Sequence, residues 1–155
     1  LHGRVVDCSA EGFTMAMDVS VHSFLRMIRL AEPLMHEGGT CLTVSFFGSV
    51  RVVKDYNMMG PVKAALESAV RYIAAELGEK GISVHALSPG PLKTRAASGI
   101  SHFDEMLNAA AARAPMHVLA SIEDVGGMAA FLASPQARNL TGGVHEIDGG
   151  YSIIA

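Results

Sequence analysis

Apolar residues recur at helical spacing along the first third of the chain. From Phe13 to Met35 the repeat predicts a helix with a break around Asp18–Ser20, where a side-chain oxygen can cap a new start. Gly38 and Gly39 then end the helix. The next run, residues 40–47, is rich in β-branched and aromatic residues and does not alternate cleanly with polar ones. It therefore predicts a strand buried on both faces.

The middle of the chain repeats this order of helix and strand. A helix is predicted from Asn57 to Leu77, followed by Gly78, with an apolar stripe at Val62, Leu66, Ala69, Val70, Ile73 and Leu77. Pro61 falls near its first turn, where the missing N–H is tolerated. A short strand from Ile82 to Leu87 then stops at Ser88-Pro89-Gly90-Pro91.

The last third predicts a loop over residues 92–101, two helices and a closing strand. The helices span Phe103 to Arg113 and Ile122 to Ala133, the second capped by Ser121, and the strand covers residues 143–147 before Asp148-Gly149-Gly150. Helices and strands that alternate with short connections indicate a parallel α/β sheet with helices on its faces.

Composition narrows the class of protein. The 155 residues suit one domain, and an apolar half with positive mean hydropathy argues against disorder. No apolar run approaches the roughly 20 residues that span a bilayer, and the first residues lack a secretory signal. A formal charge of −3 gives no reason to expect nucleic acid or an anionic membrane. Cys8 and Cys41 fit reduced thiols, so we expect a cytoplasmic protein.

Candidate chemistry begins with the segment 55–63, Asp-Tyr-Asn-Met-Met-Gly-Pro-Val-Lys. Tyr56 and Lys63 are seven positions apart, which on a helix is two turns less about 20° and places both on one face, roughly 10 Å apart. A tyrosine and a long lysine can then lean into one cleft. Taken alone, such a pair is more often a helix-start tyrosine and a surface lysine that happen to have this spacing.

A second candidate is the segment 88–100, Ser-Pro-Gly-Pro-Leu-Lys-Thr-Arg-Ala-Ala-Ser-Gly-Ile. It follows the carboxyl end of a predicted strand, where open α/β sheets place their ligands. Gly90 permits unusual backbone angles and Pro91 stiffens the turn, which lets main-chain groups face a ligand.

In this order, the two segments and the ending Glu146-Ile147-Asp148-Gly149-Gly150 resemble the enoyl-acyl-carrier-protein reductases, a branch of the short-chain dehydrogenases/reductases. Tyr-x6-Lys is typical of that branch, whereas most short-chain dehydrogenases have Tyr-x3-Lys. The final turn is shared by nearly all of them and supports the fold alone. The resemblance implies the C-terminal portion of one Rossmann-like, doubly wound parallel sheet domain, spanning residues 1–155.

The resemblance also implies roles for particular residues. Tyr56 and Lys63 would be the catalytic pair, with Phe46 at the position of the family's second tyrosine. NADH, with NADPH left open, would contact Lys63, Gly90, Leu92, Lys93, Thr94, Arg95 and Ala96. The substrate would contact Phe46, Tyr56, Met59, Ala96 and Ile100. Residues 96–112 would correspond to the family's substrate lid.

Two residues depart from the family's pattern. Phe46 lacks the hydroxyl of the second tyrosine, which leaves Tyr56 as the phenol that donates to the substrate oxygen. Arg95 stands where an apolar residue is common, beside the expected phosphates, where a cation is favourable.

The implied reaction is hydride transfer from reduced nicotinamide to the β-carbon of a trans-2-enoyl thioester carried on acyl carrier protein, within bacterial type II fatty acid synthesis. Tyr56 would stabilise the enolate oxygen, and Lys63 would bind the nicotinamide ribose. The family is usually a homotetramer, so a homo-oligomer is implied.

The chain lacks the glycine-rich turn with which a dinucleotide-binding fold opens. We therefore expect it to be the latter three-fifths of a longer domain. Without an earlier neighbour, the strand at 42–47 would be a long apolar edge, and the isolated chain would associate or be poorly soluble.

Several alternatives stay open. A related reductase could use this scaffold on a ketone, the chain could be a partner-binding module that uses its two long helices, or it could be a non-catalytic remnant. A metal site is not predicted, because no two histidines have ligand spacing together with a third partner. Ser45 lacks the Gly-x-Ser-x-Gly surroundings of a nucleophile.

Overall fold

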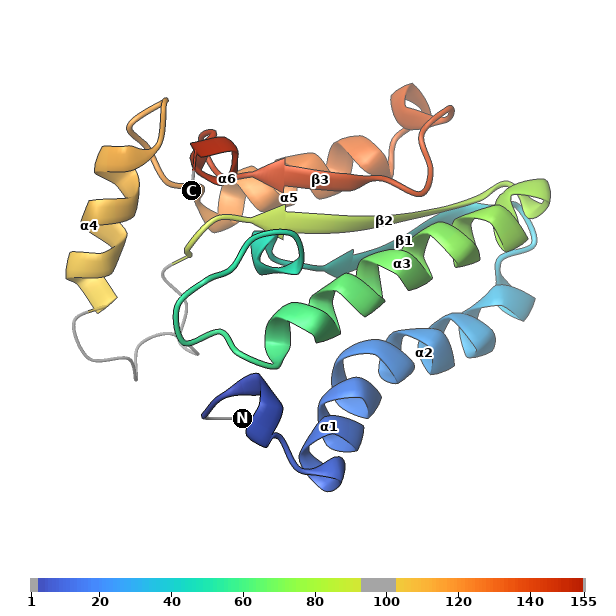
Figure 1. The fold of residues 1–155 in the computed structure, drawn as a ribbon. Coiled ribbons are helices and arrows are strands. Elements are labelled where there is room, and N and C mark those ends of the chain that lie inside the picture. The colour runs from blue at the N-terminus through green and yellow to red at the C-terminus, as the bar shows by residue number, and fades with distance from the viewer. Residues whose placement is uncertain (1–2, 93–102, 155) are drawn as a thin grey trace.

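The computed structural model describes residues 3–92 and 103–154, which form a three-layer α/β unit (Figure 1). A parallel sheet in the order β1-β2-β3 forms the middle layer. The strands are β1 (Gly39–Val44), β2 (Ile82–Pro89) and β3 (Val144–Ile147). The helices are α1 (Ala10–Met17), α2 (Ser23–Ala31), α3 (Met59–Leu77), α4 (Phe103–Arg113), α5 (Ile122–Leu132) and α6 (Tyr151–Ile154). The predicted parallel α/β class is confirmed.

The first predicted helix is two helices joined by a π-helical turn at Asp18–His22. The predicted break is therefore confirmed in place, although the chain stays helical there and makes no side-chain cap. The start at Phe13 was predicted too late. The Ser9 hydroxyl accepts from the Gly12 N–H at 3.0 Å and caps a helix that begins at Ala10.

Strand β1 is shorter and more exposed than predicted. It ends at Val44, and the chain turns at Phe47–Ser49 into a short 3₁₀ helix. The prediction that it is buried on both faces was wrong, because β1 lies at the edge of the sheet and its residues are half-buried or exposed. The strand buried along nearly its whole length is β2, which pairs on both sides.

Helix α3 begins at Met59, two residues later than predicted. Asp55 and Asn57 have left-handed backbone angles, with φ of 63° and 50°, which no residue inside a right-handed helix can adopt. Pro61 is the third helical residue. A proline is tolerated there because N–H groups of the first turn have no partner inside the helix. After Gly78 the chain continues as one 3₁₀ turn to Lys80, and Gly81, at φ 69°, ends it.

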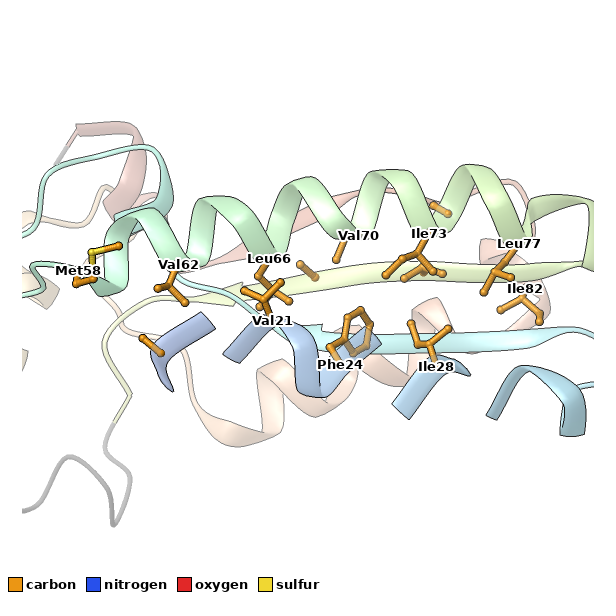
Figure 2. Packing of buried hydrophobic residues seen from close by; sticks show 14 residues of the cluster. Val21, Phe24, Ile28, Met58, Val62, Leu66, Val70, Ile73, Leu77 and Ile82 are labelled. Atoms are coloured by element: carbon orange, nitrogen blue, oxygen red, sulfur yellow. The ribbon is translucent and has the colours of Figure 1, made fainter. Parts of the chain in front are cut away.

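The larger core cluster lies between the sheet and the helices α1 to α3. In Figure 2, side chains along α3 point toward Val21, Phe24 and Ile28 of the neighbouring helical segment. From the sheet, Ile82, Val84 and Ala86 of β2 pack into the same cluster and are almost fully buried. Since successive strand residues face opposite sides, the residues between them turn to the other face.

Helix α5 covers that other face, where Leu87, Leu132 and Ala137 form a second, smaller core. Ser121 and Asp124 make a capping box at its start, as the sequence predicted for Ser121. Helix α4 packs against α6, a short helix that was not predicted. Among the described helices, none has both the length and the apolar character to cross a membrane.

Candidate active site

The three strands end side by side, which brings Phe46, just beyond β1, and Gly90, just beyond β2, to one edge of the sheet. Backbone pairing continues one residue past the strands: Ser45 N–H donates to the Leu87 carbonyl at 2.7 Å, and Gly90 N–H donates to the Ile147 carbonyl at 2.9 Å. Ligands of open α/β sheets bind outside this carboxyl edge.

Tyr56 lies in the turn before α3 and not on the helix. Its N–H donates to the Val53 carbonyl at 3.2 Å, and its own carbonyl accepts from Met59 N–H at 3.1 Å. The argument that Tyr56 and Lys63 share one helix face was therefore wrong. The position of Tyr56 comes from this turn and from ring packing, with the Phe46 and Tyr56 ring centroids 4.9 Å apart.

A neighbouring glycine also fits closely against the Tyr56 ring. A Cβ added to Gly48 would lie 2.6 Å from Cδ1 of Tyr56, closer than real carbon contacts allow. Burial of the phenol, together with the charge of Glu67, raises the pKa of Tyr56 to about 12. Tyr56 is consequently a neutral hydrogen-bond donor near pH 7.

Lys63 projects from the first part of α3 toward the end of β1. Its Nζ donates to the Val44 carbonyl at 2.8 Å, which leaves two of its three N–H donors for a ligand. Burial lowers the pKa of Lys63, and the charge of Glu67 opposes that change.

An open hollow of about 410 Å³ lies next to Tyr56. It is lined by Val5, Gly48, Ser49, Val50, Arg51, Val52, Val53, Tyr56, Asn57, Gly60 and Pro61. Met59, predicted to contact substrate, is half-buried and packs against the core of α1 to α3.

The structure gives Gly90 a different role from the one predicted for its backbone freedom. Gly90 is not among the glycines with positive φ, and a Cβ there would lie 2.9 Å from Cβ of Asp148. Glycine is thus required by the close approach of the two strand ends. Leu92 follows three residues after the end of β2. The predicted contacts Lys93, Thr94, Arg95, Ala96 and Ile100 lie outside the described residues.

The turn after β3 has a structural role. Both Asp148 oxygens accept main-chain N–H groups, from Gly150 at 2.9 Å and Ser152 at 2.7 Å, which caps α6. Gly149 has a φ of 63°, and a Cβ there would lie 2.6 Å from the Val118 carbonyl oxygen. The Asp148-Gly149-Gly150 sequence therefore has a structural role, because it caps α6 and packs closely against the backbone at Val118.

Sequence reasoning missed Glu67, a buried acid one helical turn after Lys63. Its Oε1 accepts a hydrogen bond from the Ser45 hydroxyl, which is buried as well. A signal existed in the sequence, because an acid at i+4 from Lys63 sits directly after Leu66 of the apolar stripe. Among the described residues, no three His, Cys, Asp or Glu side chains gather as metal ligands do.

The sequence model of the enoyl-(acyl carrier protein) reductases matches residues 1–152. The chain belongs to this family. It is 46% identical, over 99% of its length, to the NADH-type enoyl-[acyl-carrier-protein] reductase of Rickettsia typhi, and 44% identical to reductase 1 of Rhizobium meliloti. It spans about 59% and 57% of those two reductases.

Solved structures of the family share the fold. The Bacillus cereus reductase, determined with NADP⁺ and an indole naphthyridinone, superposes with a TM-score of 0.95 at 42% identity. The NADH-type reductase of Aquifex aeolicus gives 0.91 at 44% identity. In each case the match covers 99% of this chain and 60% of the solved one, so the chain corresponds to part of the Rossmann-like domain of this family.

Proposed function

We propose that this chain supplies the catalytic part of an enzyme that reduces trans-2-enoyl-acyl-carrier-protein thioesters with NADH in fatty acid synthesis. The observation that carries the proposal is the neutral phenol of Tyr56 at the carboxyl edge of the sheet, in a chain of the enoyl reductase family. The relatives' names supply the substrate class and the cofactor.

The residues at this edge fit the ribose end of a nicotinamide cofactor. Lys63 keeps two N–H donors beyond its bond to the Val44 carbonyl, which suits a pair of ribose hydroxyls. Main-chain groups of Gly90 and Leu92, with the hydroxyl of Thr94, would hold the carboxamide and phosphates. When bound, the reduced nicotinamide supplies the hydride.

Tyr56 would act on the thioester carbonyl. As hydride reaches the β-carbon, negative charge develops on the thioester oxygen. A neutral phenol donates a hydrogen bond to that oxygen, and such donors count most where water is excluded. Phe46 packs on the Tyr56 ring and adds no hydroxyl, so its role would be to orient Tyr56 and border the acyl chain.

Replacing Tyr56 with phenylalanine tests the catalytic assignment. We expect Tyr56→Phe to lower turnover of a crotonyl thioester by about 100-fold to 1,000-fold, the usual loss of one oxyanion donor. NADH affinity should stay unchanged, because the phenol acts on the substrate. Absorbance of NADH follows turnover, and fluorescence titration gives the dissociation constant. Tyr72→Phe, at an exposed tyrosine, is the control.

The same assays separate the competing functions. A preference for ketones over enoyl thioesters would point to a different short-chain reductase. A chain that binds no reduced nicotinamide at all would favour a partner-binding module or a non-catalytic remnant. Preference between NADH and NADPH follows from comparing the two dissociation constants.

Assembly and location belong to the same proposal. We infer a homo-oligomer acting in the cytoplasm. A reducing compartment agrees with Cys8 and Cys41, which are both free thiols. Light scattering of the protein with its cofactor would measure the number of subunits.

A further inference from the structure

Glu67 is an acidic side chain held in the core, with only 6% of its surface exposed. Burial of a carboxylate is costly unless the group is paired, so such a residue calls for an explanation. Its partner is the hydroxyl of Ser45, which is 3% exposed and donates to Oε1 of Glu67. The pair joins the middle of α3 to the chain directly beyond β1.

Ser45 stands between two residues that contact the predicted catalytic pair. The carbonyl of Val44, just before it, accepts the hydrogen bond from Lys63 Nζ at 2.8 Å. The ring of Phe46, just after it, packs 4.9 Å from the Tyr56 ring, centroid to centroid. The Ser45 N–H is itself tied to the Leu87 carbonyl at 2.7 Å. Fixing Ser45 therefore fixes the segment that places both Tyr56 and Lys63.

The charge of Glu67 acts on the same two groups. After burial, it is the second cause that raises the pKa of Tyr56, and it opposes the lowering of the pKa of Lys63 by burial. Both effects favour a neutral phenol and a charged ammonium. On the β3 side, burial raises the pKa of Glu146, and the charges of Asp148 and Glu67 raise it further. The charge of Glu67 thus acts on the pKa of Tyr56, Lys63 and Glu146.

We propose that Glu67, acting through Ser45, is a positioning residue that holds Tyr56 and Lys63 in their working arrangement. The inference rests on the proposed function, because it assigns Glu67 to the same reductase site. It adds a buried Ser45–Glu67 pair to the groups on which turnover depends, although neither residue needs to touch substrate or cofactor.

The test uses the full chain with Glu67→Gln, which keeps the size of the side chain and removes its charge. Nuclear magnetic resonance titration of Lys63 and Tyr56 is the main readout, since a purely structural role would leave their ionisation unchanged. We expect both groups to titrate at lower pH than in the parent chain. Glu76→Gln, at an exposed acid on the same helix, is the matched control. In this variant Tyr56 and Lys63 should titrate as they do in the parent chain.

Ser45→Ala provides the second variant and leaves the carboxylate in place. We expect it to loosen the Phe46–Tyr56 ring contact, seen in ring-current shifts, and to weaken NADH binding by about tenfold. Because Ser45 and Glu67 act in series, the double variant should lose no more NADH affinity than the more affected single variant. Additive losses would contradict the proposed linkage.

The outcomes separate this inference from the proposed function. If Glu67→Gln leaves the titrations of Tyr56 and Lys63 unchanged and Ser45→Ala leaves the ring contact intact, the positioning role is overturned. If the parent chain binds no NADH, the proposed function fails for this chain, whereas the titrations, which need no cofactor, still decide the role of Glu67.

Discussion

At the scale of residues, burial has opposite effects on the two members of the predicted catalytic pair. It raises the pKa of Tyr56 to about 12 and lowers the pKa of Lys63. In each case the neutral form is favoured, because charge is costly away from water. The charge of Glu67 adds to the first effect and opposes the second. The arrangement suits a phenol that donates a hydrogen bond and does not act as a base.

Lys63→Ala should weaken NADH binding. Hydrogen bonds from a charged group contribute about 1.5–3 kcal/mol, which corresponds to a loss of affinity of about tenfold to a hundredfold. Fluorescence titration with NADH measures it, and Lys54→Ala, at an exposed lysine, is the control. An unaltered dissociation constant in Lys63→Ala would count against its role.

Gly48→Ala should disturb catalysis through the Tyr56 ring. The added Cβ would lie 2.6 Å from Cδ1 of Tyr56, so the ring must move. Because a shift of about 1 Å in a reacting group can lower the rate about a hundredfold, we expect a loss of that size in enoyl thioester turnover.

Gly126→Ala is the matched control for Gly48→Ala. A Cβ at Gly126 meets nothing within 4 Å, and the residue lies inside α5. There alanine should keep turnover and raise the free energy of unfolding by about 0.5–1 kcal/mol. Full activity in Gly48→Ala would show that Tyr56 does not depend on this contact.

At the scale of elements, β2 and β3 share a pair of histidines on the face covered by α5. His145 Nε2 and His85 Nδ1 are 3.0 Å apart, and His85 is fully buried. Burial lowers the pKa of both rings, and for His85 the neighbouring His145 lowers it further. The two rings are therefore neutral in the folded chain near pH 7.

This histidine pair should make stability depend on pH. A histidine whose pKa is lower in the folded chain than its ordinary 6.5 binds protons more readily once unfolded. The contribution of such a buried, neutral histidine to the free energy of unfolding is fully present above pH 6.5. It is lost as the pH falls below that value. Urea unfolding between pH 7 and pH 5 should show the free energy of unfolding decreasing.

Substitution identifies the source of that pH dependence. His145→Gln should flatten the profile, because one titrating ring and its coupling to His85 are removed. His36→Gln, at an exposed histidine, should leave the profile as it is. A parent profile that is flat below pH 6.5 would refute the assignment.

At the scale of the whole molecule, β1 forms one edge of a three-stranded sheet. No described strand pairs with its outer side, so its backbone groups there can accept another strand, and Val44 at its end is 53% exposed. We expect the isolated chain to associate as its concentration rises, measured by size-exclusion chromatography with light scattering. A monodisperse monomer over the whole range would contradict this.

A double variant separates the sheet edge from the outer helical surface. Leu30 and Leu34 are exposed there, at 70% and 77%. If the edge of β1 drives association, association should persist in the double variant Leu30→Lys with Leu34→Lys. Loss of association in that variant would assign it to the helical surface.

The sequence by itself determined the class of fold, the family and the candidate pair. Helical and strand periodicities are local properties of neighbouring side chains, so they located α3, α4, α5 and the three strands to within a few residues. The Tyr-x6-Lys interval and the segment after β2 pointed to the enoyl reductases because their order along the chain is itself sequence information.

The tertiary structure decided what depends on residues distant in sequence. The left-handed angles at Asp55 and Asn57 placed Tyr56 in a turn ahead of α3, so packing against Phe46 and Gly48 fixes it, and helical phase does not. Strand β1 is exposed because it lies at the edge of the sheet. The residues of a strand do not reveal whether it will lie at an edge or in the centre. Glu67 joined the site for the same reason, because its partner Ser45 lies 22 positions away and meets it only when α3 packs on β1.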